Sequence, residues 1–440
     1  MHSTFKLARS RRTISPVVMS EFRGDSLLRS SSYDARLLFL TRFTRLFAYG
    51  ALSVVLVFYL TGIGLRESRI GSLLTLILVG DTIVTLVLTT QADRIGRRRM
   101  LIIGSFLMTG AGLAFAFTNN FSFLVIAGMI GVVSPSGNEV GPFLSIEQAA
   151  LTHVTSASTR TTAFAWYTLT GSFATAIGSL CGGLLPSLVD SGGTAAIKGY
   201  RAVVITYAVL GTVLTLVFTQ LSAATEVGTS EDRLRGLAAK NSLLGIEHSR
   251  DIVLRLSGLF ALDSFGGGFV VQSFAAYWFY LRFGVKPAAL GAIFFGANIF
   301  AGISALLASQ LASRFGLVRT MVFTHLPSNL MLILLPLMPT LRLAIGVLLL
   351  RFSISQMDVP TRQSYTMAVV RPEERSAAAG ITGVARTIGA SIPPLFVGLM
   401  FATPSLINAP FFIAGALKIA HDLLFYRQFV AIQPPEGKSR

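Results

Sequence analysis

The sequence predicts an all-α integral membrane protein with twelve transmembrane helices in two pseudo-symmetric six-helix bundles. Three observations support this: hydrophobic residues make up 52% of the chain and charged residues 13%, apolar runs of membrane length recur along it, and features of the first half return in the second. Soluble domains carry about a quarter charged residues, so lipid is the expected solvent for most of this surface.

Each apolar segment is long enough, at ~1.5 Å per residue, to cross a hydrocarbon layer of ~30 Å. In the first half these segments lie near residues 36–61, 69–91, 99–117, 121–150, 164–188 and 200–221. In the second half they lie near residues 254–282, 288–312, 319–339, 342–369, 376–402 and 406–428.

Five regions follow from these segments. We expect a cytosolic N-terminal tail (1–35), a first bundle (36–221), a polar and charged cytosolic linker (222–253), a second bundle (254–428) and a cytosolic C-terminal tail (429–440). The loops expected inside carry more arginine and lysine than those expected outside, which directs both termini to the cytosol.

The basic balance of the chain, +17 at pH 7, is explained by this inward bias and by anionic headgroups, so no nucleic-acid partner is expected. We expect a monomer in the plasma membrane. An organelle membrane stays open because the stretch Lys6–Arg12 is Arg- and Ser-rich like a transit peptide.

Cysteine and histidine give no sign of a metal or cofactor. Cys181 is the single cysteine, and no zinc-like spacing appears among the scattered histidines His2, His153, His248, His325 and His421. No nucleophile–base pair can be assembled from motif spacing, so an enzyme is not predicted.

Short motifs recur with an offset of roughly 220 residues, as in parallel halves of a transporter. Phe58-Tyr59-Leu60 returns as Phe279-Tyr280-Leu281, and Gly71 returns as Gly291. Arg94-x-Gly96 returns as Arg314-x-Gly316.

The polar turn after the second segment contains Asp93-Arg94-x-Gly96-Arg97-Arg98. It resembles the loop between helices two and three of major facilitator superfamily transporters, although Thr89 stands where that family has a glycine. The resemblance implies secondary transport by alternating access and a cytosolic gate. In that gate Asp93 would meet the start of segment eleven near Ser376, and Arg97 or Arg98 would pair with Glu373 or Glu374.

Segment five reads Gly171-x6-Gly178-x3-Gly182-Gly183. This is similar to the glycine-rich fifth helix of proton-coupled exporters in the superfamily, which favours efflux, although such spacing also serves helix packing. An uncoupled facilitator, an importer and a transporter-like sensor that moves nothing remain alternatives.

Intramembrane polar residues are the candidates for a site, because a charge at the bilayer centre is costly and usually faces a cavity. They are Asp81, Glu139, Asp263, Gln272, Arg351, Gln356 and Asp358. Segments four and ten are interrupted near Pro135 and Pro360, and matched interruptions point to a binding site. Because burial disfavours the charged form of a carboxyl group, we expect proton coupling through Asp81, Glu139, Asp263 or Asp358.

Three further arginines, Arg42, Arg45 and Arg386, lie toward the predicted cytoplasmic ends of their segments. There they either snorkel and pair with loops or face the cavity. With Arg351 they weakly favour an anionic or amphiphilic small organic solute over a cation.

Overall fold

The structure is a computed structural model that describes residues 33–138, 141–155, 160–189, 195–226, 248–371 and 374–431. The predicted N-terminal tail up to residue 32, most of the predicted linker and the candidate Glu139 lie outside these residues.

The first half contains α3 (Tyr33–Gly62), α4 (Glu67–Ile95), α5 (Arg97–Phe117), α6 (Phe121–Ile130), α7 (Phe143–Val154), α8 (Arg160–Val189), α9 (Ala195–Phe218) and the short η1 (Ala223–Thr225). The second half contains α11 (Arg250–Gly268), α12 (Gln272–Phe283), α13 (Pro287–Phe315), α14 (Leu317–Leu334), η2 (Leu335–Leu337), α15 (Leu341–Ser355), α16 (Asp358–Val369), α17 (Arg375–Ser391), α18 (Pro393–Phe401), η4 (Pro404–Leu406) and α19 (Ala409–Phe429).

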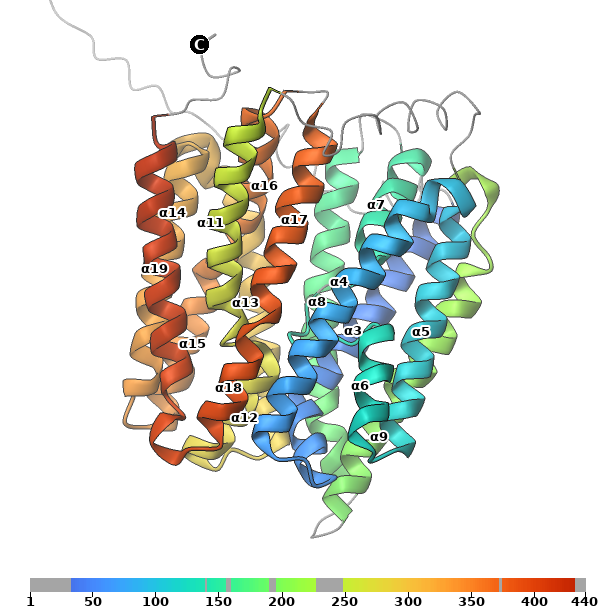
Figure 1. The fold of residues 1–440 in the computed structure, drawn as a ribbon, viewed down its shortest axis with the longest axis vertical. Coiled ribbons are helices and arrows are strands. Elements are labelled where there is room, and N and C mark those ends of the chain that lie inside the picture. Colours follow the sequence, from blue (N-terminus) through green and yellow to red (C-terminus); the bar gives the residue numbers. More distant parts are fainter. Residues whose placement is uncertain are drawn as a thin grey trace, which may run out of the picture.

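Within the described residues, eleven helical spans are long and apolar enough to cross a membrane. The fourth crossing is divided into two short helices, the apolar α6 and α7, which completes twelve crossings. The predicted fold class is therefore confirmed. Figure 1 shows the two halves side by side, with α7, α16 and the C-terminal end of α19 at one end and α6, α12 and α18 at the other. We call these the cytosolic end and the outer end, following the orientation that the arginine bias predicts.

Several crossings are interrupted. The expected breaks in crossings four and ten lie between α6 and α7 and between α15 and α16, and crossings seven and eleven break as well. Crossing seven breaks after three consecutive glycines, Gly266–Gly268, and α18 begins with two prolines at its first turn. Glycine weakens a helix and proline favours a helix start, so both added breaks follow from local sequence.

The repeat is visible in the backbone. Gly96 (φ 119°) and Gly316 (φ 85°) each lie between two consecutive crossings and precede the helix that follows, and both have positive φ, which glycine adopts at little cost. The two positions are 220 residues apart (316 − 96), as the repeated motif predicted.

The halves meet through α12, α13, α17 and α18 of the second and α3, α4 and α8 of the first. At the outer end the approach is backbone to backbone. A Cβ placed on Gly71 of α4 would lie 2.8 Å from the Cα of Gly398 of α18, and one on Gly183 of α8 would lie 2.7 Å from the Cα of Gly291 of α13. In contrast, the cytosolic-end helices α7, α11 and α16 pack mainly on elements of their own half.

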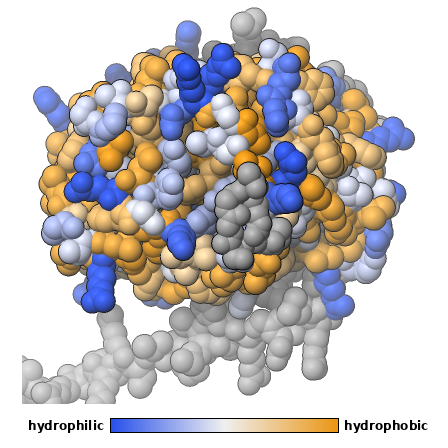
Figure 2. Space-filling model, turned by 90° about the horizontal axis from the view of Figure 1, so that it is seen from below, coloured by the Kyte–Doolittle hydropathy of each residue, from blue (hydrophilic) through white to orange (hydrophobic). Residues whose placement is uncertain are grey.

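The surface suits lipid. Large apolar side chains are exposed on the outward sides of many helices, among them Phe106, Phe117, Leu188 and Phe323. In the view from below, hydrophilic side chains are interspersed among hydrophobic ones (Figure 2).

Candidate functional site

The first half contains a buried ion pair between crossings one and four. Arg45 of α3 donates to both carboxylate oxygens of Glu147 of α7 at 2.8 and 2.7 Å, and neither side chain is exposed. Thr41 and Tyr167 also donate to this carboxylate. Because such fork-to-fork pairs satisfy both partners, Glu147 and Arg45 are fully engaged here.

Arg42 of α3 is held by Tyr167 of α8. Its Nε donates to the carbonyl of Tyr167 at 2.7 Å, and its guanidinium lies 4.2 Å from the centre of the Tyr167 ring. Arg42 lies nine residues (42 − 33) from the start of α3, roughly 14 Å at the usual helical rise.

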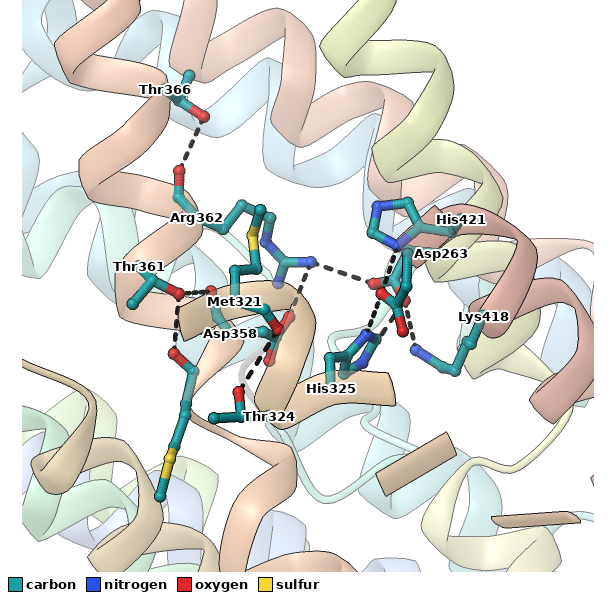
Figure 3. A network of polar contacts seen from close by, with 12 residues as sticks. Asp263, Met321, Thr324, His325, Asp358, Thr361, Arg362, Thr366, Lys418 and His421 are labelled. Atoms are coloured by element: carbon teal, nitrogen blue, oxygen red, sulfur yellow. Dashed lines mark hydrogen bonds and ion pairs between the residues drawn. The ribbon is translucent and has the colours of Figure 1, made fainter. Parts of the chain in front are cut away.

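The second half contains a larger network between crossings seven, nine, ten and twelve (Figure 3). Asp263 of α11 accepts from Lys418 of α19 at 2.6 Å and from Arg362 of α16 at 3.1 Å. Arg362 also lies 3.3 Å from Asp358, one turn earlier on α16. The two carboxylates predicted as candidates are therefore brought together by one arginine.

Two histidines that lie far apart in sequence meet in this network. Nδ1 of His325 on α14 lies 2.8 Å from Oδ1 of Asp422 on α19, and Nδ1 of His421 lies 3.1 Å from the same oxygen. Asn329 donates to the other oxygen of Asp422 at 2.8 Å. All four side chains are buried.

Asp263, His325 and His421 each offer a ligand atom within 4.8 Å of the others, the spacing of a possible metal site. However, Lys418 and Arg362 already occupy the two oxygens of Asp263. The ammonium of Lys418 and the guanidinium of Arg362 thus supply the positive charge that a metal ion would bring. We therefore describe the cluster as a network of ion pairs.

Arg351 of α15 and Arg386 of α17 differ from Arg42 and Arg45 of the first half. Both are partly buried, and within the described residues the Nε of each has no hydrogen-bond partner. Both lie within electrostatic range of Asp263 and Asp358. Arg386 is eleven residues (386 − 375) into α17, roughly 16 Å from its start.

A polar seam joins the halves at the helix breaks. Nε2 of Gln272, the first residue of α12, donates to Ser53 of α3 at 2.8 Å and to Ser179 of α8 at 3.0 Å. Asn298 of α13 donates to Gln272 Oε1 at 3.2 Å. Beside them, the backbone amide of Ser273 donates at 3.1 Å to the carbonyl of Pro135 in the break of crossing four.

The remaining candidates are dispersed. Asp81 is 5% exposed inside the first half, within electrostatic range of Tyr207 of α9. Gln356 is half-buried at the junction of α15 and α16. Neither joins the network of the second half among the contacts of the described residues.

The signature turn makes contacts that differ from the expected gate. The backbone amides of Arg97 and Arg98 donate to Glu226 at 2.8 and 3.1 Å, and the guanidinium of Arg97 reaches the carbonyl of Thr225 at 3.3 Å. Glu374 accepts instead from the amides of His248 and Ser249. The side chains of Asp93, Arg94 and Ser376, and all of Glu373, lie outside the described part.

A sequence profile described as Major Facilitator Superfamily matches residues 38–394. The chain belongs to the Major Facilitator Superfamily. A relative from Saccharomyces cerevisiae, named uncharacterized membrane protein YJR124C, is 30% identical over 92% of this chain and 96% of its own length.

Several solved structures have a fold similar to that of this chain along almost its whole length. The partially occluded, inward-open xylose transporter XylE from E. coli has a TM-score of 0.70 at 14% identity, covering 93% of this chain and 100% of its own. A bacterial homolog of the human lysosomal transporter Spinster, inward-facing and occupied, has a TM-score of 0.69 at 16% identity, covering 92% and 98%. The nucleoside transporter NupG has a TM-score of 0.66 at 14% identity, covering 90% and 99%.

Membership of the Major Facilitator Superfamily makes the chain a multi-pass membrane protein of transporter type, with a small molecule as its substrate. The signature turn, the repeat and the twelve crossings were the features that pointed to it.

Proposed function

We propose that the protein is a secondary active transporter that moves a small organic anion by alternating access, coupled to protons, and that the structure is its inward-facing state. The supporting observation is the asymmetry of the contact between the halves. The outer ends meet at Gly71–Gly398 and Gly183–Gly291, whereas α7, α11 and α16 at the cytosolic end pack on their own half. The XylE and Spinster-homolog structures of similar fold are described as inward-open and inward-facing.

The substrate class rests on the arginines. Arg45 and Arg42 already have partners, whereas the guanidinium Nε atoms of Arg351 and Arg386 have no hydrogen-bond partner among the described residues. Guanidinium groups bind carboxylate, phosphate or sulfate through charge-assisted hydrogen bonds. An anionic solute bound from the cytosolic side would satisfy both.

Proton coupling is supported by the buried carboxylates Asp263 and Asp358, which share Arg362. The direction we propose is efflux, from the glycine-rich fifth crossing. Import is the second candidate, because a D-xylose–proton symporter has a similar fold with a TM-score of 0.67.

Transport into proteoliposomes tests the proposal, with a panel of radiolabelled organic anions, cations, sugars and nucleosides and a ΔpH of either sign. We expect saturable accumulation of an anion that depends on the ΔpH. Arg351→Gln and Arg386→Gln should each lower kcat/KM about tenfold or more, since a hydrogen bond to a charged group contributes about 1.5–3 kcal/mol.

The matched control is Arg342→Gln, because Arg342 is exposed at the start of α15. The substrate class would be contradicted if only cations or neutral solutes were transported. It would also be contradicted if kcat/KM for an anion were unchanged in both arginine variants. Anion transport that ignores ΔpH would contradict the coupling.

A further inference from the structure

Three aspartates are buried in the network of the second half, and one of them differs from the others. Asp263 pairs with Lys418 and Arg362, and Asp358 pairs with Arg362. Asp422 is 1% exposed, and its hydrogen-bond and ion-pair partners among the described residues are His325, His421 and Asn329. No lysine or arginine of the described chain pairs with it.

An ionised carboxylate buried without a cation is strongly unfavourable, so such a group is either paired or neutralised. Asn329 donates a hydrogen bond but carries no charge. Histidine can take up one proton near neutral pH and then donates from both ring nitrogens. The His325–Asp422–His421 cluster therefore has a place for one proton that none of the fixed cations fills.

The surroundings of the His325 and His421 rings differ, and they favour His325 as the residue that binds the proton. Nε2 of His325 lies 3.9 Å from Oδ1 of Asp263, whereas Nε2 of His421 is buried with no hydrogen-bond partner in the described chain. A proton on His325 would face two carboxylates, one through each ring nitrogen. A proton on Nε2 of His421 would face no acceptor.

We propose that His325 is the proton-binding residue of the second half, oriented by Asp422 and facing Asp263. The proton on His325 then acts as a third cation beside Asp263, together with Lys418 from α19 and Arg362 from α16. The other charges facing this group are Asp358 on α16, Arg351 on α15 and Arg386 on α17. When His325 binds the proton, the ion pair between Asp263 and Arg362 becomes weaker. When His325 releases the proton, this ion pair becomes stronger.

This contact matters because Arg362 lies on α16, the cytosolic part of crossing ten, and Asp263 on α11, the cytosolic part of crossing seven. Protonation of His325 therefore changes the strength of the ion pair that joins α11 to α16. The inference rests on the proposed function in one respect, namely that the proton bound by His325 is the proton that drives transport.

Proton binding can be measured without a substrate. Full-length protein labelled with ¹⁵N-histidine in nanodiscs would be titrated by NMR from about pH 5 to pH 9, with His325→Gln and His421→Gln to assign the signals and His153→Gln as the exposed control. We expect the signal lost in His325→Gln to change protonation state within this range. A His325 signal that keeps one state throughout would overturn the proposal.

A second variant covers the case in which His325→Gln fails to fold. Asp422→Asn keeps the shape of the cluster but removes its unpaired charge, so we expect His325 to lose its proton at a lower pH than in the wild type. An unchanged titration of His325 in Asp422→Asn would overturn the role given to Asp422.

ΔpH-driven transport of the anion found in the panel separates the two proposals. Loss of ΔpH dependence in His325→Gln, with His153→Gln unaffected, supports the inference. If ΔpH dependence persists in His325→Gln, the role of His325 in coupling is overturned while the proposed function stands. If His325 titrates but wild-type transport ignores ΔpH, the proposed coupling is overturned while the proton site stands.

Discussion

Arg362 on α16 binds Asp263 on α11 at 3.1 Å, and this pair repeats, with acid and base exchanged, the pair of Arg45 on α3 and Glu147 on α7. In each half the pair joins the first crossing to the fourth. Such pairs tie the two helices within one half rather than across the halves, which suits bundles that move as units. We expect the two pairs to differ in role. The first is saturated by Thr41 and Tyr167, and the second shares Asp263 with Lys418.

The pair in the first half is expected to be structural. Glu147→Ala should lower the free energy of unfolding by about 3–5 kcal/mol, because it leaves Arg45 buried without its partner. Thermal unfolding of the purified protein in detergent measures this as a fall in Tm.

The double variant Arg45→Met with Glu147→Leu is the control, since replacing a buried pair by apolar residues is often close to neutral. It should recover most of the loss. Equal Tm values for Glu147→Ala and the wild type would contradict a structural role.

The close approach at the outer end is expected to stabilise the inward-facing state that we propose for this structure. In Gly71→Val the new side chain would meet the backbone of Pro394 and Gly398, which cannot move aside as a flexible side chain can. The outer ends should therefore separate, and the population should shift toward an outward-facing state.

Gly110→Val on α5 is the matched control, because a Cβ on Gly110 meets no atom within 4 Å. Accessibility of outer-end cysteine labels to a membrane-impermeant reagent would report the shift. Equal labelling in the two valine variants would count against this account of the outer contact.

The polar seam should contribute to the same state. Gln272→Leu removes the donor to Ser53 and Ser179 and should weaken the inward-facing state by about 1–2 kcal/mol, a change of roughly five- to thirtyfold in the ratio of the two states. The same labelling assay measures it, with Gln310→Leu at an exposed position of α13 as the control. A ratio equal to that of the control would mean that the seam does not distinguish the states.

Much of the architecture could be predicted from the sequence. Membrane-length runs and the arginine bias have a direct physical cause in the bilayer, and the 220-residue repeat is typical of two related halves. The described residues contain the twelve crossings that these features predict. The sequence also indicated Gln272, Asp263 and Asp358 as candidates, because polar residues at membrane depth need partners, and the structure gives each of them a polar contact.

The histidine cluster could not be seen as a pattern, because 97 residues separate His325 from Asp422 and only helix packing brings α14 against α19. One signal was present nonetheless. Lys418, His421 and Asp422 are ionisable residues inside an apolar segment, which is the same reason that identified Asp263.

The contacts of the signature turn differ from the gate that the sequence predicts. The sequence motif names residues that can pair across the halves, but it carries no information on which state a structure adopts. In this state Glu226 accepts from the amides at the start of α5, where the positive end of the helix dipole favours a carboxylate.

The most direct test of alternating access uses pairs of spin labels in a Cys181→Ser background. One pair, at positions 153 and 371, spans the cytosolic ends of crossings four and ten, and a second pair, at 119 and 342, spans the outer ends; all four positions are exposed. Pulsed electron–electron double resonance in nanodiscs should give two distances for each pair, with populations that change in opposite directions between the pairs when pH is changed or Gly71→Val is introduced. A single distance for both pairs under every condition would contradict the account.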